Sequence, residues 1–194
     1  MTSICVFCGA SPGRDPKHIA LAKSVGISLA DANHRLIYGG GGLELMGAVA
    51  RSAYKAGGKV LGIMPEFLAD VEKTLTDVEH ILVADMHARK IMMYDESDAF
   101  IVLPGGIGTL EETIEILSWM RLNLHEKPLV FLDDTGYWDP IIRGLHHTIE
   151  EGFAPKSFAK DIHSASTVHD ALDIIADKIA NPNIREPLNI HNKV

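Results

Sequence analysis

The sequence contains only two cysteines, no long apolar run and no excess of positive charge. No stretch approaches the roughly 18 consecutive apolar residues that a membrane-spanning helix needs, and no leader-like apolar segment follows the first residues. We therefore expect a cytoplasmic protein with no membrane partner. The formal net charge of -8 argues against the basic stripe that neutralises phosphates along a nucleic-acid groove, so we expect no nucleic-acid partner.

Neither the cysteines nor the ten histidines form a pattern typical of a metal site. Cys5 and Cys8 lie three residues apart in a strand-like segment, where their side chains point to opposite faces. No histidine stands in an H-E-x-x-H motif, and His146 and His147 are neighbours on a predicted helix, which makes them a poor chelating pair. We expect no metal and no redox role for the cysteines.

With 194 residues, of which 46% are hydrophobic, the chain is long enough to form one sizeable core. Short apolar runs alternate with longer segments of helical pattern, which predicts an α/β fold with a mostly parallel sheet flanked by helices. We expect a single domain over residues 1–180 and a polar tail over residues 181–194. Strands are predicted at residues 3–8, 35–38, 59–63, 80–83, 99–103 and 129–132. Helices are predicted at residues 16–33, 43–56, 86–97, 108–122, 138–151 and 168–180.

Three glycine-rich loops follow predicted strands, at residues 8–13, 38–42 and 103–109. In parallel sheets ligands bind beyond the carboxyl ends of the strands, so these loops are candidate binding elements. The third loop is the strongest signal, because its glycines let backbone amides approach a ligand just before a helix begins at Gly108 or Thr109. Its spacing is neither a Walker A loop nor a dinucleotide fingerprint, and by itself it indicates only an anion site.

Three other features each allow two interpretations. Thr109 and Glu112 form a T-x-x-E pattern at a helix start, which is either a capping box or part of a site. The four consecutive glycines of the second loop suit close approach to a ligand, or simply a tight turn. The adjacent Arg89 and Lys90 either reach toward a phosphate or lie on the solvated surface. We place Gly40 and Gly41 of the second loop among the candidate ligand contacts.

The third loop and its helix read Pro104-Gly105-Gly106-Ile107-Gly108-Thr109-Leu110-Glu111-Glu112. This resembles the P-G-G-x-G-T-x-x-E signature of the Lonely Guy (LOG) family of cytokinin riboside 5′-monophosphate phosphoribohydrolases, whose members were often labelled lysine decarboxylases. Met86-His87-x-Arg89-Lys90 stands at the family's usual distance upstream. Residues 8–11, 38–41 and 45–47 agree, as does Trp119 followed by His125-x-Lys127-Pro128, so the likeness covers roughly residues 3–151.

The resemblance implies a Rossmann-like three-layer fold that hydrolyses the N-glycosidic bond of an adenosine 5′-monophosphate, N6-modified or plain. It implies a small-molecule nucleotide substrate, no cofactor, and a homodimer. Arg89 and Glu112 would be the catalytic pair. Residues placed near the substrate by the resemblance are Lys90, Gly105, Gly106, Ile107, Gly108, Thr109, Leu110, Glu111 and Ser118. The segment 65–78 differs in length from plant members, which leaves recognition of the base open.

Glycosidic cleavage builds positive charge on the sugar, so a carboxylate such as Glu112 would stabilise it and activate water, while Arg89 fixes ribose and phosphate. The chief alternative is a non-catalytic nucleotide or molybdenum-cofactor carrier of the same fold. A lysine decarboxylase is a weaker alternative, because no lysine is marked as a Schiff-base residue. After the signature helix, four apolar residues are either core or a partner face: Trp119, Met120, Leu122 and Leu124.

Overall fold

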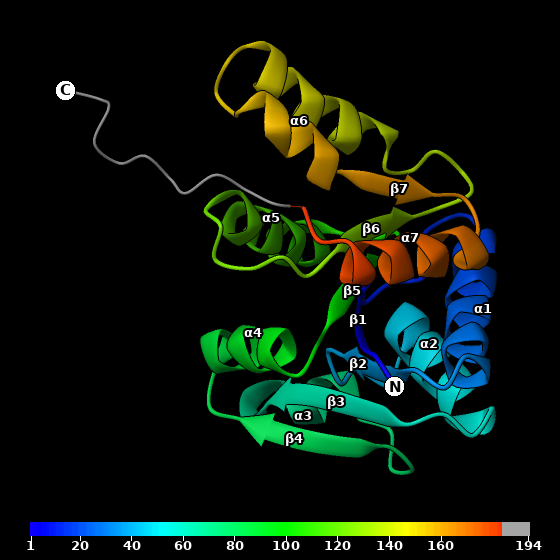
Figure 1. The fold of residues 1–194 in the computed structure, drawn as a ribbon. Helices are drawn as coiled ribbons and strands as arrows, with labels where there is room; N and C mark the ends of the chain where they lie inside the picture. Colours follow the sequence, from blue (N-terminus) through cyan, green and yellow to red (C-terminus); the bar gives the residue numbers. More distant parts are fainter. Residues whose placement is uncertain (184–194) are drawn as a thin grey trace.

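The computed structural model describes residues 1–183, and most of the predicted polar tail therefore lies outside the described residues. Seven strands form one sheet in the order β4-β3-β2-β1-β5-β6-β7, and every neighbouring pair is parallel. The mostly parallel sheet predicted from the sequence is thus confirmed (Figure 1). The strands are β1 Ser3–Phe7, β2 Arg35–Tyr38, β3 Val60–Pro65, β4 Glu79–Val83, β5 Ala99–Val102, β6 Leu129–Leu132 and β7 His163–Ala165.

Helices cover both faces of the sheet and make the three-layer α/β fold. Residues of α1, α2 and α7 pack in the core cluster on one face, and those of α4, α5 and α6 pack in the cluster on the other. The helices are α1 Lys17–Asp31, α2 Glu44–Lys55, α3 Glu66–Glu72, α4 Met86–Asp95, α5 Ile107–Arg121, α6 Asp139–Glu150 and α7 Val168–Ala180, with a 3-10 helix η1 at Lys156–Asp161.

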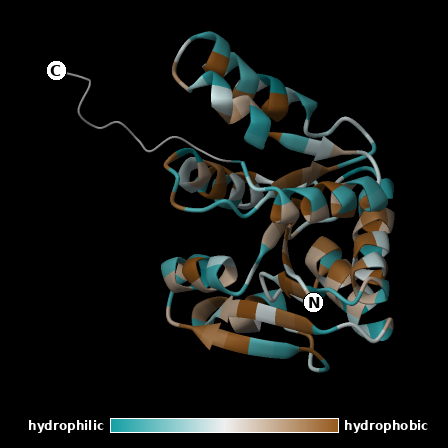
Figure 2. Cartoon of the chain, viewed as in Figure 1, coloured by the Kyte–Doolittle hydropathy of each residue, from teal (hydrophilic) through white to brown (hydrophobic). Residues whose placement is uncertain are grey.

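The apolar strands form the centre of the molecule because both of their faces are covered. Alternate residues of β1 enter opposite core clusters: Ile4 and Val6 pack on one face, Cys5 and Phe7 on the other. Figure 2 shows the inner strands as hydrophobic ribbons and the helices as mixed. Cys8 packs in the cluster opposite that of Cys5, so the expected divergence of the two cysteines is confirmed.

The sequence prediction missed three short elements: α3, η1 and β7. Strand β7 has three residues and none of them is buried, so it lacks the apolar run that marked the other strands. Helix α3 has seven residues, too few for a helical period to stand out. It begins after Pro65 and ends at Lys73, whose φ of 49° lies in the left-handed region.

None of the described helices is long and apolar enough to cross a membrane.

Candidate active site

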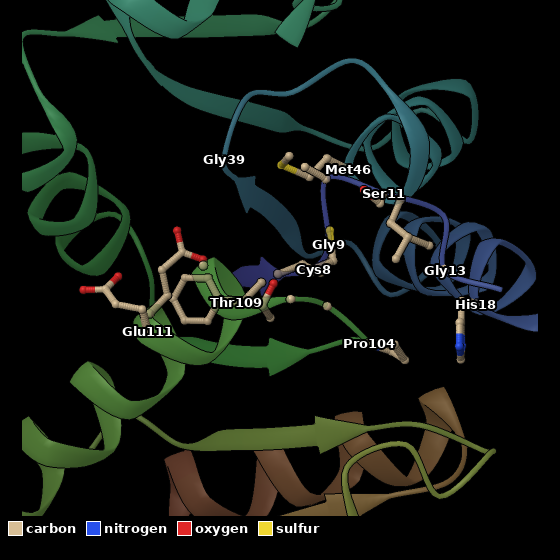
Figure 3. Close-up of a pocket in the computed structure, with 18 of the residues that line it drawn as sticks. Cys8, Gly9, Ser11, Gly13, His18, Gly39, Met46, Pro104, Thr109 and Glu111 are labelled. Carbon is tan, nitrogen blue, oxygen red and sulfur yellow. The ribbon is translucent and has the colours of Figure 1, made fainter. Parts of the chain in front are cut away.

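A cavity of about 730 Å³ opens at the carboxyl ends of β1 and β5. The strand order changes direction between these two strands, and open α/β sheets bind ligands in the crevice at that point. The volume is in the range of small-molecule sites, roughly 300–1,000 Å³. All three glycine-rich loops contribute to its wall, through Gly9, Gly39 and Pro104 among others (Figure 3).

The start of α5 presents backbone amides to this cavity. The helix begins at Ile107 after an extended N-cap at Gly106, which has no side chain to satisfy the free amides of the first turn. A Cβ added at Gly106 or Gly108 would meet no atom within 4 Å, so the backbone is open at both positions. An anion is the natural partner for amides at a helix start, because the helix dipole adds to their hydrogen bonds.

The capping-box interpretation of Thr109 and Glu112 is wrong, because the helix starts earlier than the pattern suggests. Thr109 is the third residue of α5 rather than its N-cap, and the N-cap Gly106 makes no side-chain cap. The backbone carbonyl of Thr109 accepts a hydrogen bond of 2.6 Å from the Thr113 hydroxyl, as in a helix interior. Glu112 lies a full turn further on, where a carboxylate cannot cap this helix.

The loop before α5 is held from two sides. The Gly9 amide donates to the Pro104 carbonyl at 3.1 Å, which joins the first glycine loop to the third. The Tyr137 hydroxyl donates to the Gly105 carbonyl at 2.6 Å from the segment after β6. Gly105 itself packs against Thr109 and Gly9 so closely that a Cβ there would collide with both. The main chain at the start of α5 is therefore fixed before any ligand binds.

Arg89 lies on α4, whose start is capped by Asp85: its carboxylate accepts from the Ala88 amide at 2.8 Å. The guanidinium donates through Nε to the Ile63 carbonyl and through Nη2 to the Gly39 carbonyl, each at 3.2 Å. Its Nη1 lies 3.7 Å from Oε1 of Glu112. The two side chains, 11% and 12% exposed, therefore share one cavity although they come from separate helices.

The second glycine loop has its own support from β4. Gly40 has a φ of 83°, in the left-handed region that favours glycine. Its carbonyl lies 3.1 Å from Nε2 of His80, which is also 3.1 Å from the Tyr38 hydroxyl. The Nδ1 of His80 is 2.8 Å from the Val78 carbonyl. These contacts fix the loop that supplies the Gly39 carbonyl to Arg89.

Burial raises the pKa of Glu112 to about 7, and the nearby Glu111 and Glu115 add to the rise, while Arg89 and Lys90 oppose it. A carboxyl group whose pKa lies near neutral pH can exchange a proton with water or substrate during a reaction. The cavity thus contains an acid–base group held against a fixed cation.

The pH dependence of the wild-type protein should follow this carboxyl. If the ionised form of Glu112 is the active one, kcat/KM for a substrate bound in this cavity rises with pH through about 7 rather than near the usual carboxyl range. The measurement is a rate profile at subsaturating substrate between pH 5 and 9. A profile that is flat between pH 6 and 8 would contradict this assignment of Glu112.

Lys90, one residue after Arg89, does not line the cavity. Its ammonium lies 2.6 Å from Glu111 and 3.1 Å from Glu115, so it joins α4 to α5. The hydrogen bond to Glu111 raises the pKa of Lys90. Its partner Glu111 lines the cavity edge and is half exposed.

The structure brings together most, but not all, of the residues that the sequence marked. Lining the cavity are Arg89, Gly105, Gly106, Gly108, Thr109, Glu111 and Glu112. Gly40 and Gly41 are buried just behind Gly39, which lines the cavity in their place. On α5, Ile107 is 83% exposed, Leu110 packs against the core, and Ser118 is exposed outside the cavity. Direct contacts of these residues with a ligand stay predictions.

The cavity also contains side chains that the sequence did not mark as site residues. Leu68 and Glu72 enter it from α3, and His18 and Tyr137 line it near the first glycine loop. Figure 3 shows His18 beside Gly13, away from Glu111 and Thr109. No spacing or motif marks these residues, because they come from segments that only the fold brings to the cavity. Among residues 1–183, no group of three or more His, Cys, Asp or Glu could hold a metal ion.

The chain has sequence relatives among known proteins. A family model described as "Possible lysine decarboxylase" matches residues 46–175. The chain is 44% identical over 155 residues to the cytokinin riboside 5′-monophosphate phosphoribohydrolase of Rhodococcoides fascians, covering 78% of this chain and 77% of that protein. It is 41% identical over 168 residues to a cytokinin riboside 5′-monophosphate phosphoribohydrolase of Arabidopsis thaliana, covering 86% of this chain and 78% of the relative.

A solved structure shares the fold. The molybdenum cofactor carrier protein of Chlamydomonas reinhardtii superposes with a TM-score of 0.72 at 20% identity, covering 93% of this chain and 99% of that one. At that identity the likeness supports a common Rossmann-like architecture and nothing about chemistry.

Proposed function

This chain belongs to the LOG family of cytokinin riboside 5′-monophosphate phosphoribohydrolases, and from that premise we propose how its cavity hydrolyses an adenosine 5′-monophosphate, plain or N6-modified, to free base and ribose 5-phosphate. The observation that carries the proposal is the pairing of Arg89 with Glu112 in one cavity. Glu112 lies within two turns of the free backbone amides at the start of α5. The chain is an enzyme of the N-glycosidase type.

The 5′-phosphate binds at the start of α5. The amides after Gly105 are free of side-chain caps, and the open space at Gly106 and Gly108 lets phosphate oxygens approach the main chain. Because the chain carries a net charge of -8, this local cluster of donors must supply the attraction that the protein as a whole does not.

Glu112 acts on the sugar. In the reaction, a water oxygen bonds to C1′ of ribose, the C1′–N9 bond breaks, and the base leaves with the electron pair and takes up a proton. The carboxylate of Glu112 accepts a proton from that water and faces the positive charge that develops on the sugar ring. Its raised pKa makes it a stronger base than an exposed carboxylate.

Arg89 orients the sugar of the substrate relative to Glu112. Two of its donor groups bind the Ile63 and Gly39 carbonyls, while Nη1, which is 3.8 Å from the Met86 sulfur, lies near Glu112 and the space where ribose would lie. The guanidinium cannot act as a base, because it stays charged at all accessible pH values. It therefore orients the sugar and keeps part of the Glu112 population ionised.

Incubation with AMP is the direct test. We expect free adenine and ribose 5-phosphate in equal amounts, separated by chromatography. Adenosine, which lacks the phosphate, should show kcat/KM at least about a hundredfold lower, since hydrogen bonds to a charged group contribute about 1.5–3 kcal/mol each. Equal rates for adenosine and AMP would show that the start of α5 is not a phosphate anchor. Tight binding of AMP without products would favour a carrier function instead.

The proposed assembly is a homodimer. Apolar side chains are exposed along one stripe of α5 and in the segment beyond it, where a second copy would bury them. Met120, by contrast, belongs to the core, and Trp119 packs partly against it. Ser118 lies on the same stripe of α5, so it would sit in the interface. The exposed apolar residues are Ile107, Ile114, Leu122 and Leu124.

Sedimentation equilibrium at micromolar concentration should give about twice the chain mass of 21.1 kDa. Leu124→Glu places a charge on the more exposed of the two leucines just after α5 and should shift the mass toward that of one chain. A wild-type protein that sediments as a single chain would contradict the dimer.

A further inference from the structure

The cavity continues past Arg89 to a carboxylate that the reaction does not use. Glu72, the last residue of α3, lines the cavity together with Leu68 one turn earlier. Its Oε2 would lie 2.5 Å from a Cβ at Gly41, so the absence of a side chain there leaves room for the carboxylate. Within residues 1–183, the Glu72 carboxylate makes neither an ion pair nor a side-chain hydrogen bond that would occupy it.

The Glu72 side chain forms part of the cavity wall. Its negative charge is among the causes that raise the pKa of the Cys8 thiol, which lies on the cavity wall after β1. Two apolar side chains line the same part of the cavity: Met46, which lies against both Gly39 and Gly41, and Leu68. An unused acceptor beside apolar side chains of a cavity can fix the orientation of a ligand.

The order of groups along the cavity places Glu72 at the base. From the amides of α5 the next group is Glu112, one turn into the helix, and then Arg89, which contacts it. Arg89 binds the Gly39 carbonyl, and two residues later Gly41 abuts Glu72. With phosphate at the first of these positions and ribose at the second, as the proposed function requires, the purine ring falls at the third.

We propose that Glu72 accepts a hydrogen bond from the exocyclic N6–H of the purine and thereby selects 6-amino over 6-oxo nucleotides. This rests on the proposed function. A 6-amino purine offers a donor to the carboxylate, and an N6-monosubstituted one keeps one N–H with its substituent directed away. A 6-oxo purine presents an acceptor at the same place, and two acceptors repel. Leu68 and Met46 supply the apolar surface on which the ring lies.

The test compares AMP with inosine 5′-monophosphate (IMP) as substrates. For the wild-type protein we expect kcat/KM for AMP at least tenfold above that for IMP. Glu72→Gln places an amide at this position, whose NH₂ can donate to a 6-oxo group, so the AMP-to-IMP ratio should fall at least tenfold. Glu66→Gln is the matched control: it removes a carboxylate from the exposed start of the same helix and should leave the ratio unchanged.

A second measurement uses the wild-type protein alone and so does not depend on a variant that folds. N6-methyl-AMP keeps one N–H, whereas N6,N6-dimethyl-AMP has none, and we expect the second to be cleaved at least tenfold less efficiently. Equal efficiency, or an unchanged AMP-to-IMP ratio in Glu72→Gln, would overturn the role of Glu72, as would a wild-type preference for IMP. If no nucleotide is cleaved at all, the proposed function fails, and the same two comparisons are made by calorimetric binding.

Discussion

Replacing Glu112 by Gln should lower kcat for AMP hydrolysis by about a hundredfold or more, with the fold intact. The amide fills the same volume and keeps a polar contact for Arg89, but it can neither take a proton from water nor offer a negative charge to the sugar. The measurement is the rate of adenine release at saturating AMP, with circular dichroism to verify folding. Glu150→Gln is the control, because Glu150 is an exposed carboxylate on α6 that does not line the cavity.

The same variant should be more stable than the wild type at alkaline pH. Because the folded-state pKa of Glu112 is raised to about 7, its contribution to stability is greatest below the unfolded-state pKa and is lost as pH rises through 7. Above pH 8 the wild type carries a buried charge, and Gln removes it. We expect a gain of about 1–3 kcal/mol in unfolding free energy at pH 8.5, and little gain at pH 5. Loss of stability at both pH values would contradict the raised pKa of Glu112. Full activity of the variant would remove Glu112 from the mechanism.

Gly105 and Gly106 should respond to alanine in opposite ways. At Gly105 a Cβ would collide with Thr109 and with the Gly9 amide, so Gly105→Ala should destabilise the protein by about 1–3 kcal/mol and also disturb the loop before α5. At Gly106 a Cβ would meet nothing, so Gly106→Ala should fold with nearly wild-type stability. Its methyl group would, however, occupy the space where phosphate oxygens approach the amides.

Gly106→Ala should therefore raise KM for AMP at least tenfold while leaving the melting temperature within about 2 °C of wild type. Thermal melts and steady-state kinetics of both variants separate the two effects. Gly144→Ala is a control for alanine at an open glycine far from the cavity, on α6. An unchanged KM in Gly106→Ala would place the phosphate elsewhere.

Most strands that the sequence predicted are apolar and buried on both faces, such as β5, and the edge strand β4 was found from its short apolar run although most of it is not buried. Local pattern suffices there because burial imposes the same demand on every residue of the strand. Strand β7 lies at the sheet edge and reads His-Ser-Ala, so its pairing with β6 depends on tertiary contact rather than on its own residues. The glycine-rich loops were likewise visible, because the turns and close approaches that they make require that residue type.

The roles of the residues in the candidate active site were harder to predict from the sequence than the strands were. Arg89 and Glu112 carry a recognisable motif, but Lys90 belongs to the same motif and instead bridges α4 and α5. The T-x-x-E pattern suggested a capping box because sequence spacing does not locate the first residue of α5. No sequence motif marked Glu72, because the space for its carboxylate exists only where Gly41, which is distant in sequence, lacks a side chain.

Arg89 and Glu112 come from helices on opposite sides of the central strand β1: α4 follows the edge strand β4, and α5 follows β5. Neither half of the sheet alone contains both. During biosynthesis a nascent chain that has folded only through α4 contains Arg89 but lacks Glu112. Catalytic competence therefore requires both halves of the sheet, so we expect turnover to recover after dilution from denaturant only when β1 has paired with β2 and with β5.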